Sequence, residues 1–145
     1  MADHDAKQNY WDSTLSKPDL PPASVFLGFE LIRCDAEKGW CEAHFVLPPQ
    51  AANPGGSAQG GFISAMLDEV MSVAGSIVQL PPAMSPTLQM TTSFIRPVSV
   101  GVQLKARGEV VRQGRAAIFT EGWLWNADGK LLAQATASCI PRSLA

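Results

Sequence analysis

The chain has 145 residues, of which 46% are hydrophobic and 17% are charged, and its formal net charge is −2 at pH 7. At roughly 100–200 residues per domain, this length predicts one globular domain, and the composition excludes a wholly disordered chain. The slight negative charge disfavours nucleic acid as the main partner, because proteins that bind nucleic acid are normally basic.

Residues 1–24 are expected to form a peripheral arm, and residues 25–145 a single domain. The arm is polar and then rich in proline, with a short helix predicted within residues 3–15. It does not resemble a secretory signal, and no apolar run reaches the roughly 20 residues that span a bilayer. Three scattered cysteines indicate reduced thiols in a cytoplasmic protein. No metal site is expected, because the only histidines, His4 and His44, lie far apart in the sequence.

Strands are predicted for residues 29–34 and 40–47, which a turn joins into a hairpin. Residues 48–60 consist almost entirely of residues that form turns and break helices, and so long a loop in a small domain is often functional. Residues 61–80 predict the one strong helix. Its polar and small side chains fall within one narrow arc, so most of the helix surface is expected to be buried.

After the helix the sequence predicts only strands, at residues 87–97, 102–112, 116–125 and 131–140. They are expected to form a meander of consecutive hairpins, which gives an antiparallel sheet. The predicted class is therefore α+β, with about six strands and one long helix covering one face. A parallel sheet of the Rossmann type is disfavoured, because the chain has no second strand–helix unit.

Candidate chemistry gathers where the long loop meets the helix. A helix start leaves unpaired backbone N–H groups, and Gly60 and Gly61 would let a ligand approach them closely. Such N–H groups can bind the oxygen of a carbonyl under attack. Two turns further on, Asp68 lies on the polar arc, where a carboxylate can act as general base or nucleophile. A plain helix start with solvent-facing Asp68 and Glu69 is the alternative, and Glu69 itself is expected to face solvent.

In these residues the sequence resembles the hotdog-fold acyl-CoA thioesterases, specifically the small single-domain PaaI-like type. That family has an asparagine six residues before a His-Gly-Gly phrase and an acidic residue nine residues after the histidine. Asn53, Gln59 and Asp68 have this spacing here. The resemblance covers roughly residues 28–140. Further matching phrases lie at residues 94–97, 101, 114–115 and 128–133.

The resemblance implies a hotdog fold, in which a sheet wraps one long helix and two protomers pair edge to edge. It also implies active sites at the dimer interface that hydrolyse an acyl-CoA without a metal or cofactor. Asp68 would be the nucleophile or the base that activates water, and the Gly60 N–H would polarise the thioester carbonyl. Asn53 would orient the carbonyl or the water, and Thr87 of the other protomer would hold the water. A covalent or general-base mechanism, and a homodimer or homotetramer, stay open.

The family's histidine is replaced here by Gln59, whose amide can orient a substrate but cannot shuttle a proton. A non-catalytic hotdog protein that binds acyl-CoA or a related ligand is therefore the alternative function. A hydratase ranks last, because neither histidine lies near Asp68. The phosphates of coenzyme A require cations, and Arg112 and Arg115, which flank a turn, are candidates for that contact. Gln59 and Gly61 complete the predicted substrate-binding set.

Overall fold

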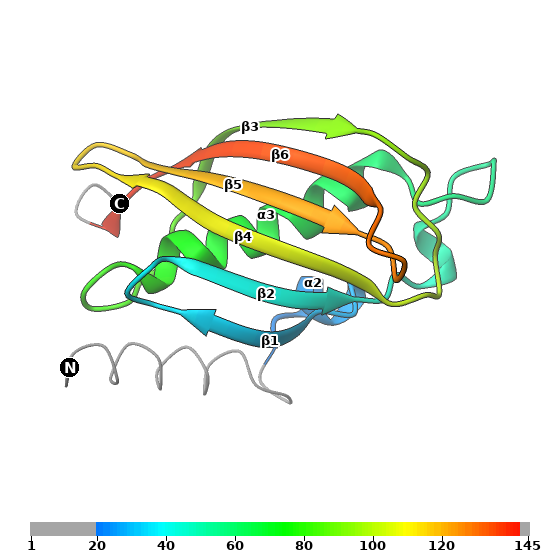
Figure 1. Cartoon of the computed structure of the whole chain (residues 1–145), viewed down its shortest axis with the longest axis horizontal. Coiled ribbons are helices and arrows are strands. Elements are labelled where there is room, and N and C mark those ends of the chain that lie inside the picture. Colours follow the sequence, from blue (N-terminus) through cyan, green and yellow to red (C-terminus); the bar gives the residue numbers. More distant parts are fainter. Residues whose placement is uncertain (1–19, 143–145) are drawn as a thin grey trace.

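The computed structural model of the chain describes residues 20–142, and the helix expected within residues 3–15 lies outside them. Figure 1 shows one sheet with a long helix, α3, lying across one of its faces. Within the described residues, the first helix, α2, crosses the expected boundary between arm and domain at residue 24. In chain order the elements are α2 (Pro22–Phe26), β1 (Glu30–Asp35), β2 (Trp40–Phe45), the 3-10 helix η1 (Pro49–Ala51), α3 (Gly60–Ile77), β3 (Thr87–Phe94), β4 (Leu104–Gln113), β5 (Ile118–Trp125) and β6 (Leu131–Cys139).

The strands form one six-stranded antiparallel sheet in the order β1-β2-β4-β5-β6-β3, which confirms the predicted α+β class. The expected meander is wrong at one point, because β3 pairs with β6 and not with β4. The connection over residues 95–103 explains the difference. Its Ile95 N–H donates to the carbonyl oxygen of Leu132 (2.9 Å), and its Gly101 N–H donates to that of Leu47 (2.8 Å). The connection is thus tied across the end of the sheet, and β4 begins beside β2.

The helix α3 packs closely on the sheet because two strands carry glycine beneath it. A Cβ atom on Gly108 of β4 would lie 2.0 Å from the carbonyl oxygen of Val70. A Cβ atom on Gly122 of β5 would lie 3.0 Å from Cγ of Met71. The prediction that most of the helix is buried is confirmed by its fully or nearly fully buried residues: Ile63, Met66, Leu67, Val70, Met71, Val73, Ala74, Gly75, Ser76 and Ile77.

The end of α3 comes at Ile77, three residues before the predicted end at residue 80. Beyond it, the side-chain amide of Gln79 donates to the carbonyl oxygens of Gly75 (3.3 Å) and Ala83 (3.1 Å). The amide therefore links the last turn of α3 to the chain that follows it.

The two edges of the sheet differ in chemistry. The edge strand β1 carries three charges, Glu30, Arg33 and Asp35, whereas the eight residues of β3 carry none. On β3, the side chains of Leu88 and Phe94 are 58% and 57% exposed. Edge strands that must not pair with another chain usually carry charge or proline. The β3 edge has neither charge nor proline.

Candidate active site

The loop before α3 is held in one shape by Asn53. The side-chain Oδ1 of Asn53 accepts hydrogen bonds from the N–H groups of Gly55 (2.9 Å) and Ser57 (3.2 Å). A short polar side chain commonly stabilises a turn in this way. The Ala58 N–H then donates to the carbonyl oxygen of Val98 (2.8 Å), which ties the loop to the end of the sheet. The oxygen of Asn53 therefore shapes the loop, and its contact with a substrate stays a prediction.

The helix α3 begins at Gly60, with Gln59 as its N-cap residue. The exposed side chain of Gln59 makes no capping hydrogen bond. Within the described residues the Gly60 N–H has no hydrogen-bond acceptor, as is usual in a first helical turn. A Cβ atom on Gly60 would lie 3.4 Å from the ring of Phe94, and one on Gly61 would meet nothing within 4 Å. The helix start thus presents an unpaired N–H beside an exposed aromatic ring.

Asp68 lies two turns into α3 and is half-buried. Thr87, the first residue of β3, donates its hydroxyl to Asp68 Oδ1 at 2.5 Å. We expected Thr87 to come from the other protomer, but this contact lies within one chain because β3 runs alongside the polar arc of α3. A hydrogen bond to a carboxylate orients it. The other oxygen, Oδ2, has no hydrogen-bond partner between residues 20 and 142.

Asp68 belongs to a row of polar contacts between α3 and the chain around β3. One turn before it, Ser64 donates its hydroxyl to that of Thr92 (3.0 Å). One turn after it, the carbonyl oxygen of Ser72 accepts from the Ser85 hydroxyl (3.0 Å). Helix positions four residues apart share a face. The polar arc predicted from the sequence therefore faces β3 and the segment before it, and not bulk solvent.

Glu69 is not the solvent-facing carboxylate that we expected. It is half-buried beside α2, where Ser24 donates its hydroxyl to Glu69 Oε1 at 2.5 Å. The rings of Phe26 and Phe62 join the same two helices, with centroids 5.2 Å apart. Burial raises the pKa of Glu69, the bond from Ser24 opposes this shift, and the neighbouring charge of Asp68 adds to it.

Gly60 and Asp68 share one helix but lie too far apart to act on the same carbonyl within one chain. Eight residues at about 1.5 Å per residue separate them by about 12 Å along the helix axis. Reacting atoms must approach to about 3–3.5 Å, and an N–H donor must lie about 3 Å from the developing oxyanion. The hydrogen bond from Thr87 also orients the carboxylate of Asp68 toward β3. One chain therefore offers two separate half-sites.

Arg112 and Arg115 lie at the hairpin between β4 and β5, on the left of Figure 1, whereas the loop of residues 48–60 lies on the right. Both arginines are exposed, and neither forms an ion pair with the described part of the chain. Arg107, by contrast, pairs with Glu42 at 2.8 Å on the outer face of the sheet. The structure thus leaves the two predicted phosphate contacts open but does not bring them to Gly60.

The three cysteines form no disulfide. Cys41 is buried and donates its thiol to the carbonyl oxygen of Val70 (3.2 Å), and burial raises its pKa to about 12. In the described residues no group of three histidine, cysteine, aspartate or glutamate side chains could hold a metal ion. No helix in that same part of the chain is long and apolar enough to cross a membrane.

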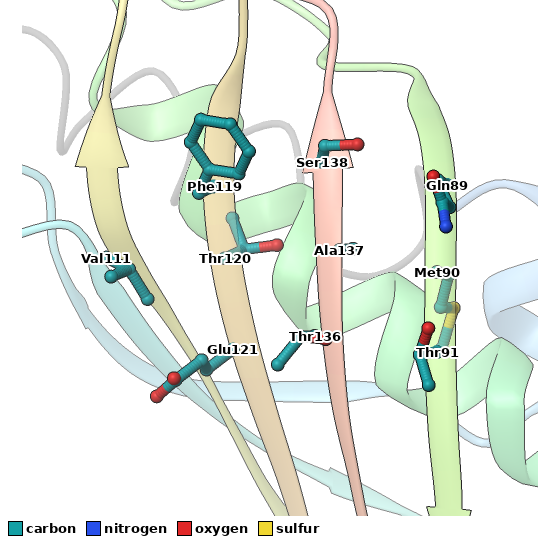
Figure 2. A pocket seen from close by; sticks show the side chains of 10 residues that line it. All are labelled: Gln89, Met90, Thr91, Val111, Phe119, Thr120, Glu121, Thr136, Ala137 and Ser138. Atoms are coloured by element: carbon teal, nitrogen blue, oxygen red, sulfur yellow. The ribbon is translucent and has the colours of Figure 1, made fainter.

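A cavity of about 440 Å³ lies on the outer face of the sheet. Figure 2 shows the side chains that line it, with α3 behind the strands. It is formed by β3, β4, β5 and β6. The sheet lies between this cavity and α3, so the cavity does not belong to the site around Asp68. Its lining residues are Gln89, Met90, Thr91, Val111, Phe119, Thr120, Glu121, Thr136, Ala137 and Ser138.

Several residues around the half-sites were missed by sequence reasoning: Ser24, Ser64, Thr92 and Phe94. The four-residue spacing of Ser64 and Asp68 was a usable signal for Ser64, because it places both side chains on one face. No local pattern identifies Ser24, since its contact with Glu69 joins residues 45 apart.

A protein-family model described as the thioesterase superfamily matches residues 55–133 of this chain. The matched range contains Gly60, Asp68 and Thr87. None of the curated proteins matches the chain.

Solved structures are also similar. The phenylacetic acid degradation-related protein of Ralstonia eutropha JMP134 is 34% identical, with a TM-score of 0.80 over 90% of this chain and 99% of that one. A Streptococcus mutans UA159 protein bound to acetyl CoA is 22% identical, with a TM-score of 0.73 over 83% of this chain and 94% of that one. The E. coli PaaI protein from the phenylacetic acid degradation operon is 21% identical, with a TM-score of 0.80 over 97% and 95%. The last two likenesses show the fold alone, which is the predicted hotdog fold.

Proposed function

The chain belongs to the thioesterase superfamily, and on that premise we propose that it hydrolyses acyl-CoA thioesters to a free acid and coenzyme A. The observation that carries the proposal is the half-buried carboxylate of Asp68, whose Oδ1 is held by Thr87 while Oδ2 is left for another partner. A carboxylate oriented in this way can attack a carbonyl carbon or take a proton from water. The similar S. mutans protein bound to acetyl CoA supports a coenzyme A thioester as the ligand.

Two routes use the same groups. In the general-base route, Asp68 takes a proton from water while the water oxygen bonds to the thioester carbon. The carbonyl oxygen gains negative charge, which the Gly60 N–H stabilises. The carbon–sulfur bond then breaks, and the thiolate of coenzyme A leaves and takes up a proton. In the covalent route, an oxygen of Asp68 bonds to the thioester carbon, and the carbon–sulfur bond breaks to release the thiolate of coenzyme A, which takes up a proton. Water then hydrolyses the resulting anhydride to the free acid and restores the carboxylate of Asp68.

The distance between the half-sites supports a reaction centre shared by two protomers. Because about 12 Å of helix separates Gly60 from Asp68, we assign them to different copies in a homodimer. Asp68 and Thr87 of one protomer then face the helix start of its partner. Each dimer has two equivalent sites, and a homotetramer would be a pair of such dimers.

The proposed dimer also suggests how the remaining predicted residues would contact the substrate. Gln59 and Gly61 flank the N–H donor, and Gln59 has an exposed amide to offer the substrate. Strand register places Thr87 opposite Cys139, and Cys139 opposite Ile118 at the start of β5. The β4–β5 hairpin with Arg112 and Arg115 therefore lies at the end of the sheet where the partner's helix start would arrive. We propose these arginines as contacts for the phosphates of coenzyme A.

The proposal also assigns the domain boundaries, the role of Asn53 and the cellular location. We propose residues 25–145 as the thioesterase domain and residues 1–24 as an arm beside it. Asn53 is the proposed orienting residue, because the contacts of its Oδ1 leave its amide nitrogen for the carbonyl or the water. Cysteines without disulfides fit a reducing compartment, so we propose a cytoplasmic location.

Thiol release from short-chain, long-chain and aromatic acyl-CoAs tests the proposal. Asp68→Asn should lower kcat by about 10²–10⁴-fold, because an amide serves as neither base nor nucleophile. Glu69→Gln is the matched control and should keep wild-type turnover, since Glu69 contacts Ser24 and α2. Binding of acyl-CoA by the wild type without any turnover would favour the alternative, a non-catalytic binding protein. Gln59 is the observation behind that alternative, since its amide cannot shuttle a proton.

A further inference from the structure

The thiol of Cys139 lies beside the hydrogen bond that holds the candidate carboxylate. Strand register sets Cys139 of β6 directly opposite Thr87 of β3 and, on its other side, opposite Ile118 of β5. Directly opposed residues of antiparallel strands share a face of the sheet. The Thr87 hydroxyl reaches Asp68 of α3. Ile118 Cγ2 lies 3.8 Å from the position of a Cβ atom on Gly75 of the same helix. Cys139, which is fully buried, therefore faces α3 between these two neighbours.

The buried thiol keeps its proton and has hydroxyl groups around it. Burial raises the pKa of Cys139, and the charge of Asp68 adds to this shift. Three hydroxyls oppose the shift, and that of Thr87 acts more strongly than those of Thr120 and Ser85. Because the pKa is raised overall, the thiol is neutral at pH 7, and a neutral thiol is a hydrogen-bond donor.

Two of the three hydroxyls are poor acceptors for the thiol proton. The Ser85 hydroxyl donates to the carbonyl oxygen of Ser72 (3.0 Å), and its oxygen also contacts the Ser76 hydroxyl (3.1 Å). The buried Thr120 hydroxyl forms no hydrogen bond with the described part of the chain, and Figure 2 shows it directed from β5 toward β6. Because its proton is uncommitted, this hydroxyl can turn to donate to the sulfur of Cys139, which is a weak acceptor. The thiol proton is then left for the third oxygen, that of Thr87.

We propose that Cys139 is a positioning residue of the site: its thiol donates to the oxygen of Thr87 and so fixes the Thr87 hydroxyl on Asp68. The proton of Thr87 is committed to Asp68 Oδ1, so the Thr87 oxygen is free to accept. Hydrogen bonds that are linked in a chain strengthen one another. The inference rests on the proposed function and adds a residue that acts on the carboxylate without touching the substrate.

Thiol release from acyl-CoA by two variants of Cys139 tests this role. Cys139→Ala removes the donor and should lower kcat about 3–10-fold with little change in KM, the effect of losing one neutral hydrogen bond. Cys139→Ser keeps a donor at the same place and should restore most of the lost kcat.

Cys41→Ala is the matched control. Cys41 is equally buried, and its thiol contacts the same helix at the carbonyl oxygen of Val70. This variant loses the same volume and should keep the wild-type kcat. An equal loss in Cys41→Ala and Cys139→Ala would assign the effect to a cavity under α3 and would overturn the proposal.

A double-mutant cycle tests whether Cys139 acts through Thr87. In a Thr87→Val chain the accepting hydroxyl is gone, so adding Cys139→Ala should lower kcat no further. A second 3–10-fold loss in that background would mean that Cys139 acts by another route, and the proposal would fall.

The hydrogen bond can also be measured without turnover. The infrared S–H stretching band of Cys139 is isolated as the difference between the wild type and Cys139→Ser. An S–H group that donates a hydrogen bond absorbs at lower frequency than a free one, so the band should move to higher frequency in Thr87→Val. A band that stays in place would overturn the proposal even in an active protein. A band that moves in a protein that hydrolyses no acyl-CoA would keep the hydrogen bond and reject the proposed function.

Discussion

Replacing Gly60 by proline should remove the proposed oxyanion donor while leaving α3 in place. Gly60 is the first residue of the helix, a position that tolerates proline. Gln59 before it has φ −61° and ψ 137°, the extended conformation that a following proline favours. Loss of one such N–H donor should lower kcat by about 10²–10³-fold, or about 2.7–4 kcal/mol of transition-state stabilisation. The melting temperature should change little.

Gly60→Ala is the control for this substitution. It keeps the N–H and adds only a methyl group, 3.4 Å from the Phe94 ring. In the thiol-release assay it should keep most of the wild-type kcat. Equal losses in both variants would assign the effect to crowding against Phe94 and would refute the role of the N–H.

Mixing Gly60→Pro with Asp68→Asn tests whether the half-sites come from different protomers. If the two variants are co-expressed in equal amounts, half of the dimers are mixed. Each mixed dimer has one site with an unaltered Gly60 from one chain and an unaltered Asp68 from the other. Activity should therefore return to about a quarter of the wild-type value. If both groups acted within one chain, every chain would carry a defect, and an inactive mixture would refute the shared site.

Three further changes probe the surroundings of the site. Thr87→Val should lower kcat about 10-fold or more, the effect of losing a hydrogen bond to a charged group, and Thr87→Ser should restore it in the thiol-release assay. Because the folded pKa of Glu69 is raised, its contribution to stability is fully present below the unfolded pKa and is lost as the pH rises through the folded value. Glu69→Gln should therefore stabilise the fold more at pH 7 than at pH 4 in urea unfolding, and equal effects at both would contradict a buried carboxylate. Gly108→Ala should cost about 3 kcal/mol or more in urea unfolding, because its Cβ meets backbone, whereas Gly122→Ala meets a flexible methionine and should cost less.

The parts of the fold that the sequence predicted well depend on local patterns. The helix was found at residues 61–80, against Gly60–Ile77 in the structure, because its polar arc is visible in the spacing of its own residues. The placement of β3 was not found. Its pairing with β6 depends on a connection tied to Leu47 and Leu132, which lie far away in the sequence.

The sequence likewise identified some residues of the candidate site and missed the surroundings of others. Asn53, Gln59 and Asp68 could be singled out because their spacing of six and then nine residues matches the pattern of the family that the sequence resembles. The environment of Glu69 could not be predicted, because its hydrogen-bond donor, Ser24, comes from the region assigned to the arm. The separation of Gly60 from Asp68 could also have been worked out from the sequence, because eight helical residues at about 1.5 Å each span about 12 Å.

The uncharged edge of β3 also affects the expected abundance of the protein in a cell. In the proposed homodimer, each chain is synthesised alone, and until a second copy binds, its β3 edge is open to other newly made proteins. Formation of the proposed dimer depends on protein concentration, so the time that a chain spends unpaired lengthens as expression falls. Substitutions that weaken the proposed dimer should therefore first reduce abundance, through aggregation and proteolysis, before any loss of turnover per molecule is measured.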